Sequence, residues 1–213
     1  MGYIRTKVIP LHETMKHLAI INHRDSFIYN LIQILREDCG AKCTVYNYSE
    51  ICNIDPANYD AVILSPGPGT TDDYPQTTEL LKKIALLPYP TPILGICLGL
   101  QLLGVLYGYK LFQLPQPVHG AAHNIIWKRS LPVWDVHKGK TMQVGLYHSW
   151  ALHQLPREET LPVVADAYDP TNGAVMALHH ISLPFYGLQF HPESILTPLG
   201  RVLIQRWMHS LLS

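Results

Sequence analysis

The amino-acid sequence predicts an α/β protein with an open, mostly parallel sheet flanked by helices, and a mixed or antiparallel extension in the second half. In the first half, short apolar runs alternate with segments of helical periodicity, which is typical of βαβ units. In the second half, the runs are shorter, alternating or β-branched, and they lie between Pro and Gly breaks. Such runs are typical of antiparallel strands.

The first half is expected to hold four strands, each an apolar or β-rich run, at residues 17–22, 43–48, 61–64 and 92–96. Apolar residues at helical spacing predict helices over residues 27–38, 77–87 and 98–107. Ser26 can cap the first of these helices, and Gly40 can end it. Because strands joined through helices lie parallel, this order predicts the parallel part of the sheet.

The second half is expected to add five strands, at residues 112–135, 141–152, 163–168, 174–179 and 185–190. A last helix over residues 201–212 carries an apolar stripe that can close the domain. Residues 1–16 show no sustained period and are expected to form an N-terminal extension. No repeat, low-complexity tract or linker divides residues 17–213, which are therefore expected to form a single domain.

The composition excludes some functions. Lys plus Arg and Asp plus Glu each number 16, and the isoelectric point is near 7.2, so no basic field is available for nucleic acid. Charged residues make up only 15% and apolar residues 47%. The usual charged fraction is about 25%, so we expect a partner subunit to cover part of the surface.

The cysteine pattern and the apolar segments indicate a reducing compartment. The four cysteines lack CxxC spacing, which argues against a disulfide framework or a zinc knuckle. No apolar run near the start is long enough for a secretory signal, so a cytoplasmic protein is expected. Residues 93–109 are nearly long enough for a membrane span, but five residues there are Gly or Gln, which favours a buried strand, a turn and a core helix. No histidine pair has enough convergent ligands for a metal, and no metal or cofactor is expected.

Cys97 is the candidate nucleophile. It lies between Gly95 and Gly99 at an expected strand-to-helix junction, which is the pattern of a nucleophile elbow with Cys in place of Ser. The dipole of the following helix favours the thiolate, and the backbone N–H of Leu98 is a candidate oxyanion donor. The alternative is a buried core thiol with glycines that serve packing alone.

A thiol nucleophile needs a base, and His191 is the candidate. It follows an apolar strand, and Glu193 stands two residues further on, where an extended chain projects both side chains to the same side. The carboxylate can then orient the ring. Because the chain contains 12 histidines, a structural role for His191 is the alternative, and its pairing with Glu193 across Pro192 favours catalysis.

The third motif is Ser65-Pro66-Gly67-Pro68-Gly69, which ends an expected strand. It lacks the Lys and Ser or Thr of a phosphate-binding loop and the GxGxxG of a dinucleotide fold. Its role is expected to be the presentation of backbone N–H groups to a ligand. A simple tight turn is the alternative.

Taken together, the motifs resemble the class I (triad) glutamine amidotransferases, whose domain is flavodoxin-like, and among them most closely the glutaminase subunits of anthranilate synthase and aminodeoxychorismate synthase. The resemblance covers residues 17–213. The segments that carry it are Asp25-Ser-Phe-Ile-Tyr-Asn-Leu31, Ser65–Gly69, Pro92-Ile-Leu-Gly-Ile-Cys-Leu-Gly99 with Gln101, His119-Gly120, Tyr147-His-Ser149 and Tyr186-Gly-Leu-Gln-Phe-His-Pro-Glu-Ser-Ile-Leu-Thr-Pro198.

The resemblance implies a Cys97–His191–Glu193 triad that hydrolyses L-glutamine through a glutamyl thioester. It also implies that the ammonia passes to a large chorismate-binding synthase subunit, and that the two chains form a hetero-oligomer. The implied oxyanion and glutamine-binding residues are Gly67, Pro68, Gly69, Leu98, Gln101, Ser149 and Trp150. Whether the product is anthranilate or aminodeoxychorismate depends on the other chain.

Five positions depart from the family pattern. His23-Arg24 replaces Asn-Tyr, Leu100 replaces His, Ala121 replaces Lys, and Trp150 replaces an aliphatic residue. None belongs to the implied triad, so the departures bear on glutamine affinity and on signalling from the partner. Three other functions stay open: a stand-alone hydrolase or peptidase of γ-glutamyl bonds, the glutaminase of another amidotransferase on the same fold, and a binding subunit without turnover.

Overall fold

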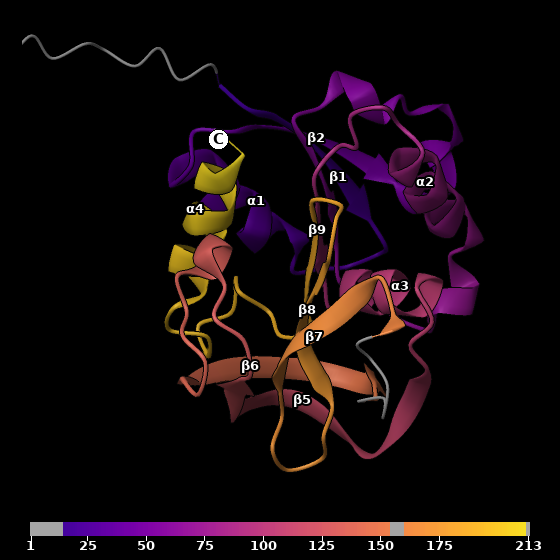
Figure 1. Ribbon diagram of the computed structural model, residues 1–213. Helices are drawn as coiled ribbons and strands as arrows, with labels where there is room; N and C mark the ends of the chain where they lie inside the picture. Colours follow the sequence, from indigo (N-terminus) through magenta and orange to yellow (C-terminus); the bar gives the residue numbers. More distant parts are fainter. Residues whose placement is uncertain (1–14, 154–159, 212–213) are drawn as a thin grey trace, which may run out of the picture.

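The computed structural model describes residues 15–153 and 160–211, and its strands form one curled sheet (Figure 1). Within this part of the chain the sheet has nine strands in the order β2-β1-β3-β4-β9-β8-β7-β5-β6. The five strands from β2 to β9 are parallel, and all the later pairings are antiparallel. The bounds are β1 His17–Asn22, β2 Lys42–Asn47, β3 Ala61–Leu64, β4 Ile93–Ile96, β5 Leu111–Trp127, β6 Thr141–Leu152, β7 Val163–Tyr168, β8 Val175–His180 and β9 Phe185–Leu188.

Helices cover both faces of the parallel part, with α1 and α4 on one face and α2 and α3 on the other (Figure 1). The strand period of two explains why two cores form: in β1, Leu18 and Ile20 face one core, while Ala19 and Ile21 face the other. The helix bounds are α1 Ile28–Glu37, α2 Pro75–Ala85, α3 Leu98–Leu106 and α4 Gly200–Ser210. The short helices are η1 Tyr48–Asn53, η2 Pro56–Asn58, η3 Thr71–Asp73 and η4 Pro132–Trp134.

The predicted fold class is confirmed, and the expected order of strands and helices is the one observed. Residues 93–109, which were weighed as a membrane span, form β4, the turn at Cys97 and α3. Within the described residues no helix is long and apolar enough to cross a membrane. Residues 1–14 of the expected extension and Leu212 of the expected last helix lie outside the described residues.

Three predicted details were wrong. The first helix has Phe27 at its N-cap with no side-chain capping bond, so Ser26 does not cap it. The long strand expected to reach Asp135 ends at Trp127, because Pro132 begins a short helix in place of further pairing. The strand of residues 185–190 ends at Leu188, although Gln189 N–H still donates to the Met176 carbonyl at 2.9 Å.

Candidate active site

Cys97 occupies a sharp turn between β4 and α3. Its backbone has φ 53° and ψ −101°, a left-handed conformation that is rare for a residue with a side chain. The Cys97 N–H donates to the Leu188 carbonyl at 2.7 Å, and the Cys97 carbonyl accepts from Gln101 N–H at 3.1 Å, so the turn is held from both sides. This is the geometry of a nucleophile elbow at the carboxyl end of a parallel strand.

The two glycines beside Cys97 are required by space. A Cβ on Gly95 would lie 2.5 Å from the Gly99 carbonyl oxygen, and a Cβ on Gly99 would lie 2.6 Å from the Leu64 carbonyl oxygen. Both distances are too short for real atoms. The absence of a side chain at Gly95 therefore lets α3 start close to β4, and its absence at Gly99 lets α3 pack against β3.

We expect Gly99→Ala to lower the free energy of unfolding by about 2 kcal/mol or more, because the new methyl group must displace backbone. The position of the Cys97 sulfur should change with it, since the displaced backbone carries Cys97. Gly139→Ala is the control. Its new Cβ would meet no atom within 4 Å, so the only unfavourable effect is the backbone strain of an alanine at φ +84°. Urea unfolding of both variants measures the difference, and equal losses would contradict the steric account.

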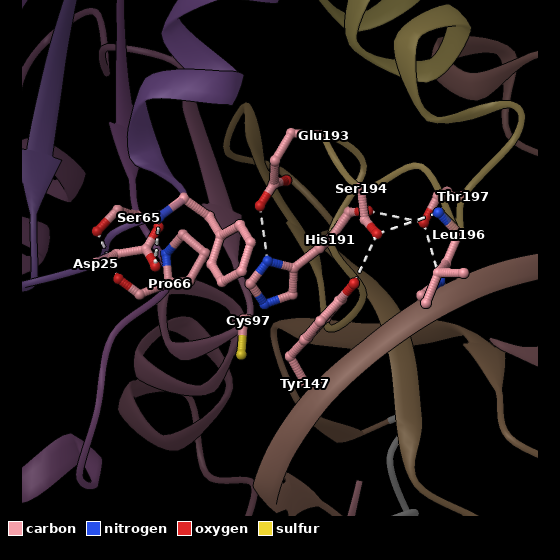
Figure 2. Close-up of polar contacts among 12 residues, drawn as sticks. Asp25, Ser65, Pro66, Cys97, Tyr147, His191, Glu193, Ser194, Leu196 and Thr197 are labelled. Atoms are coloured by element: carbon pink, nitrogen blue, oxygen red, sulfur yellow. Dashed lines mark hydrogen bonds and ion pairs between the residues drawn. The ribbon is translucent and has the colours of Figure 1, made fainter. Parts of the chain in front are cut away.

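His191 and Glu193 form a buried ion pair close to the elbow. His191 Nδ1 lies 2.6 Å from Glu193 Oε1, and the two side chains are only 4% and 1% exposed. Figure 2 shows Glu193 and Cys97 on opposite sides of the His191 ring. The carboxylate therefore fixes the ring with Nε2 as its free nitrogen.

The charge state of His191 follows from its neighbours. Burial lowers its pKa, but interactions with Cys97 and Glu193 outweigh burial and hold the pKa well above 6.5. Nε2 of His191 is buried and has no hydrogen-bond partner among the described residues. It is therefore available to a reacting group beside the sulfur.

The loop after His191 is fastened to β6. The Thr197 hydroxyl donates to the His191 carbonyl at 2.7 Å and accepts from Gly145 N–H at 2.9 Å, while His191 N–H donates to the Gly145 carbonyl at 3.1 Å. The Tyr147 ring packs against the imidazole with ring centroids 4.9 Å apart, and its hydroxyl lies 3.0 Å from Ser194 Oγ (Figure 2). These contacts hold the imidazole on a rigid element.

The Ser65–Gly69 segment lies against the elbow, because a Cβ on Gly67 would come within 3.0 Å of Leu98. Pro68 and Gly69 are exposed. The Tyr74 hydroxyl donates to the Pro68 carbonyl at 2.7 Å. Because a trans peptide points its N–H away from its carbonyl, this bond turns Gly69 N–H away from Tyr74. Tyr74 thus fixes the predicted donor loop, a role that the sequence motif gave no sign of.

His23, one of the departures from the family pattern, supports the same segment from inside. Its backbone N–H donates to Ser65 Oγ at 2.9 Å, Nδ1 lies 3.2 Å from the Ser65 carbonyl, and Nε2 lies 2.9 Å from the Thr77 hydroxyl. Burial lowers the pKa of His23 from 6.5 to about 4, although the bond to the Ser65 carbonyl opposes this. His23 is therefore neutral at pH 7 in the folded chain.

A neutral buried histidine makes stability depend on pH. Between pH 6.5 and about 4 the unfolded chain binds a proton at His23 that the folded chain does not, so stability falls as pH falls. We expect His23→Asn to flatten this dependence by up to about 1.4 kcal/mol per pH unit. Denaturant unfolding across this pH range measures it. His148, whose pKa burial lowers to about 4, keeps its own share in the variant, and an unchanged slope would contradict the prediction.

The predicted glutamine-binding residues of β6 lie beside a break in the strand pairing. The register of β5 and β6 jumps between Gln113 and Val118, and it gives Ser149 no partner in β5. Pro115 and Pro117 lie in the jump, where they cannot donate ladder hydrogen bonds. The Trp150 carbonyl accepts from Gln101 Nε2 at 2.7 Å. Gln101 is thus joined to this segment, and its side chain is buried.

Two other histidines pair with buried carboxylates. His123 Nδ1 lies 3.1 Å from Asp169 Oδ2, and His179 Nδ1 lies 2.9 Å from Asp166 Oδ2. In the part of the chain that the structure describes, no group of three or more His, Cys, Asp or Glu side chains is placed to hold a metal. A cavity of about 900 Å³ lies by Pro92 and Pro184, at the opposite ends of β4 and β9 from Cys97.

The parallel sheet, the elbow at Cys97 and the buried imidazole–carboxylate pair define an α/β protein of the nucleophile-elbow class. The chain belongs to the class I glutamine amidotransferase family, whose sequence profile matches residues 19–211. The resemblance stated from the motifs is thereby confirmed.

Two curated relatives and one solved structure illustrate the likeness. Anthranilate synthase component 2 of Saccharolobus solfataricus is 36% identical over 194 residues, which cover 89% of this chain and 96% of that protein. The aminodeoxychorismate synthase of Streptomyces pristinaespiralis is 36% identical over 192 residues, which cover 88% of this chain but 25% of that protein. A glutamine amidotransferase structure from Thermotoga maritima has a TM-score of 0.70 at 17% identity, covering 92% of this chain and 81% of that one, and supports the fold alone.

Proposed function

We propose that this chain, with residues 17–213 as its one domain, is the glutaminase subunit of a two-chain synthase in the cytoplasm. It hydrolyses L-glutamine to glutamate and ammonia. The observation that carries the proposal is the geometry around His191, whose Nδ1 is bound to Glu193 and whose buried Nε2 is unpaired beside Cys97. Most buried side-chain nitrogens have a hydrogen-bond partner, so an unpaired ring nitrogen beside a thiol supports the role of a base.

In the first half of the reaction, Cys97 Sγ attacks the side-chain amide carbon of glutamine. A C–S bond forms, and the carbonyl oxygen becomes an oxyanion that the N–H groups of Leu98 and the Gly67–Gly69 segment stabilise. The C–N bond then breaks as His191 Nε2 gives its proton to the departing nitrogen. Ammonia leaves, and a glutamyl thioester remains on Cys97.

In the second half, water attacks the thioester carbon, and His191 Nε2 accepts a proton from the water. The C–S bond breaks, and glutamate and the thiolate are released. The raised pKa of His191 suits this exchange, because the ring holds a proton readily near neutral pH while the thiolate is its partner. Gln101, Ser149 and Trp150 are assigned to the amino-acid end of glutamine.

The partner is a large synthase subunit that uses chorismate, which would receive the ammonia directly. The relatives named as anthranilate synthase components and as aminodeoxychorismate synthase support this assignment. Exposed apolar side chains near the triad support docking there. Phe27, whose ring packs 6.1 Å from that of His191, is 43% exposed, and Ile195, two residues after Glu193, is 94% exposed.

The test measures glutamate release from the chain alone and with the large subunit. We expect slow release alone and faster release in the complex, with the transferred nitrogen found in the aromatic product. If the chain alone cleaves γ-glutamyl peptides as fast as the complex releases glutamate from glutamine, the alternative of a stand-alone γ-glutamyl hydrolase is supported. No release under either condition would overturn the glutaminase assignment.

A further inference from the structure

A chain of two buried amides connects the nucleophile to the β6 segment. Gln189, which follows β9 and is fully buried, donates from Nε2 to Cys97 Sγ at 3.5 Å. Gln189 Oε1 accepts from Gln101 Nε2 at 3.1 Å. The same Gln101 nitrogen donates to the Trp150 carbonyl at 2.7 Å. The reaction described above uses none of these contacts between amides.

The direction of this chain is fixed from its far end. The Trp150 carbonyl can only accept, so Gln101 must present its NH₂ group to it. The second hydrogen of that group then points to Gln189, which must present its oxygen in return. The NH₂ group of Gln189 is thereby left facing the sulfur. If Gln101 were reversed, its oxygen would face the Trp150 carbonyl oxygen, and if Gln189 were reversed, two NH₂ groups would face each other in a buried place.

An N–H donor aimed at sulfur favours the charged form of the group. Hydrogen bonds to an anion are about twice as strong as those to a neutral group, and burial strengthens them further. Cys97 is 5% exposed and Gln189 fully buried, so water cannot take over this role. When Cys97 gives up its proton, the His191 imidazolium would supply a nearby positive charge, and the Gln189 amide would supply an uncharged hydrogen-bond donor.

We propose that Gln189 is a catalytic residue that stabilises the Cys97 thiolate, and that Gln101 is the residue that positions it. The inference rests on the proposed function, since it refines the same site. It also gives Gln101 a role besides contact with glutamine, because both hydrogens of its NH₂ group are donated within the protein, to the Trp150 carbonyl and to Gln189 Oε1. Through Trp150, the segment assigned to the amino-acid end of the substrate is joined to the nucleophile.

The test follows alkylation of Cys97 by iodoacetamide in the folded chain, read by peptide mass spectrometry. Cys52 is exposed and serves as the reference thiol in the same molecule. In Gln189→Met, which keeps length but has no donor, we expect the Cys97 rate relative to Cys52 to fall about 10-fold at neutral pH. The pH of half-maximal alkylation should rise. Gln101→Met should change both in the same direction by less.

Two further variants keep the test decisive. Gln189→Glu can still accept from Gln101 but turns a carboxylate toward the sulfur, so it should slow alkylation at least as much as Gln189→Met. Gln76→Met, on the exposed side of α2, is the control and should change nothing. In glutamine hydrolysis, Gln189→Met should lower kcat about 10-fold and leave KM within about 3-fold.

Alkylation requires no glutamine turnover, so this proposal and the glutaminase assignment can fail separately. If Gln189→Met lowers the melting temperature but the ratio of the Cys97 and Cys52 alkylation rates stays at the wild-type value at every pH, the two amides serve the fold alone and the proposal is overturned. If the ratio falls but no variant and no wild-type chain hydrolyses glutamine, the proposed function is wrong and the assignment of Gln189 to the thiolate stands.

Discussion

Cys97→Ser should lower glutamine-dependent synthesis about 10⁴-fold or more. A serine hydroxyl is a much weaker acid than a thiol, and the imidazole at this elbow is not basic enough to activate it. Synthesis from added ammonium salts should stay within about 2-fold of wild type, because the large subunit then receives ammonia directly. The measurement is product formation by the reconstituted two-chain complex with each nitrogen source. The side chain is nearly isosteric and 5% exposed, so the fold should be kept.

The matched control is Cys52→Ser, which changes an exposed thiol away from the elbow and should leave both activities unchanged. A Cys97→Ser complex that keeps glutamine-dependent activity would mean that another group attacks the amide. Loss of both activities together would indicate that the variant no longer assembles with its partner, and a pull-down of the large subunit separates that case.

Glu193→Gln should lower kcat for glutamine hydrolysis about 10³-fold, because the amide removes the negative charge that raises the pKa of His191. The glutamine oxygen can still accept from Nδ1, so the ring should keep its place. The alkaline side of the kcat profile should move to lower pH, because a less basic imidazole keeps its proton for the leaving nitrogen only at lower pH. A pH profile of kcat measures this.

Stability should fall as well. The Glu193 side chain is 1% exposed and pairs with the His191 ring at 2.6 Å. Removing one partner of a buried ion pair is unfavourable, so Glu193→Gln should lower the free energy of unfolding, most of all below pH 6.5, where the His191 ring is protonated in the folded and the unfolded chain. Denaturant unfolding measures this loss, and a folded variant that keeps full glutaminase activity would contradict the catalytic role of the carboxylate.

The sequence was sufficient to predict the fold class and the place of the elbow, because both depend on local signals. Runs of buried-strand type alternate with helical periodicity, and Gly95 and Gly99 are spaced as a strand-to-helix turn requires. The exact ends of the helices and strands were missed where a second residue nearby could also end or begin the element. Ser26 has a capping side chain, yet the chain enters α1 one residue later, at Phe27.

The contacts that support the site could not be predicted, because each depends on a turn or a strand pairing that the motifs do not specify. Tyr74 reaches Pro68 only through the turn at η3, and Gln189 meets Cys97 only because β9 pairs with β4. Gln189 lies inside the quoted motif around His191, so its position carried a signal, but no spacing rule indicates a donor to sulfur. The triad and the glutamine-binding residues stay predictions until chemistry is measured.

The most direct test of the central claim, that the Cys97 thiolate attacks glutamine, is inactivation by a diazoketone analogue of glutamine followed by peptide mass spectrometry. The account predicts one covalent adduct per chain, on Cys97, formed more slowly when L-glutamine is present. An adduct on any other residue, or labelling of Cys97 that glutamine does not slow, would contradict it.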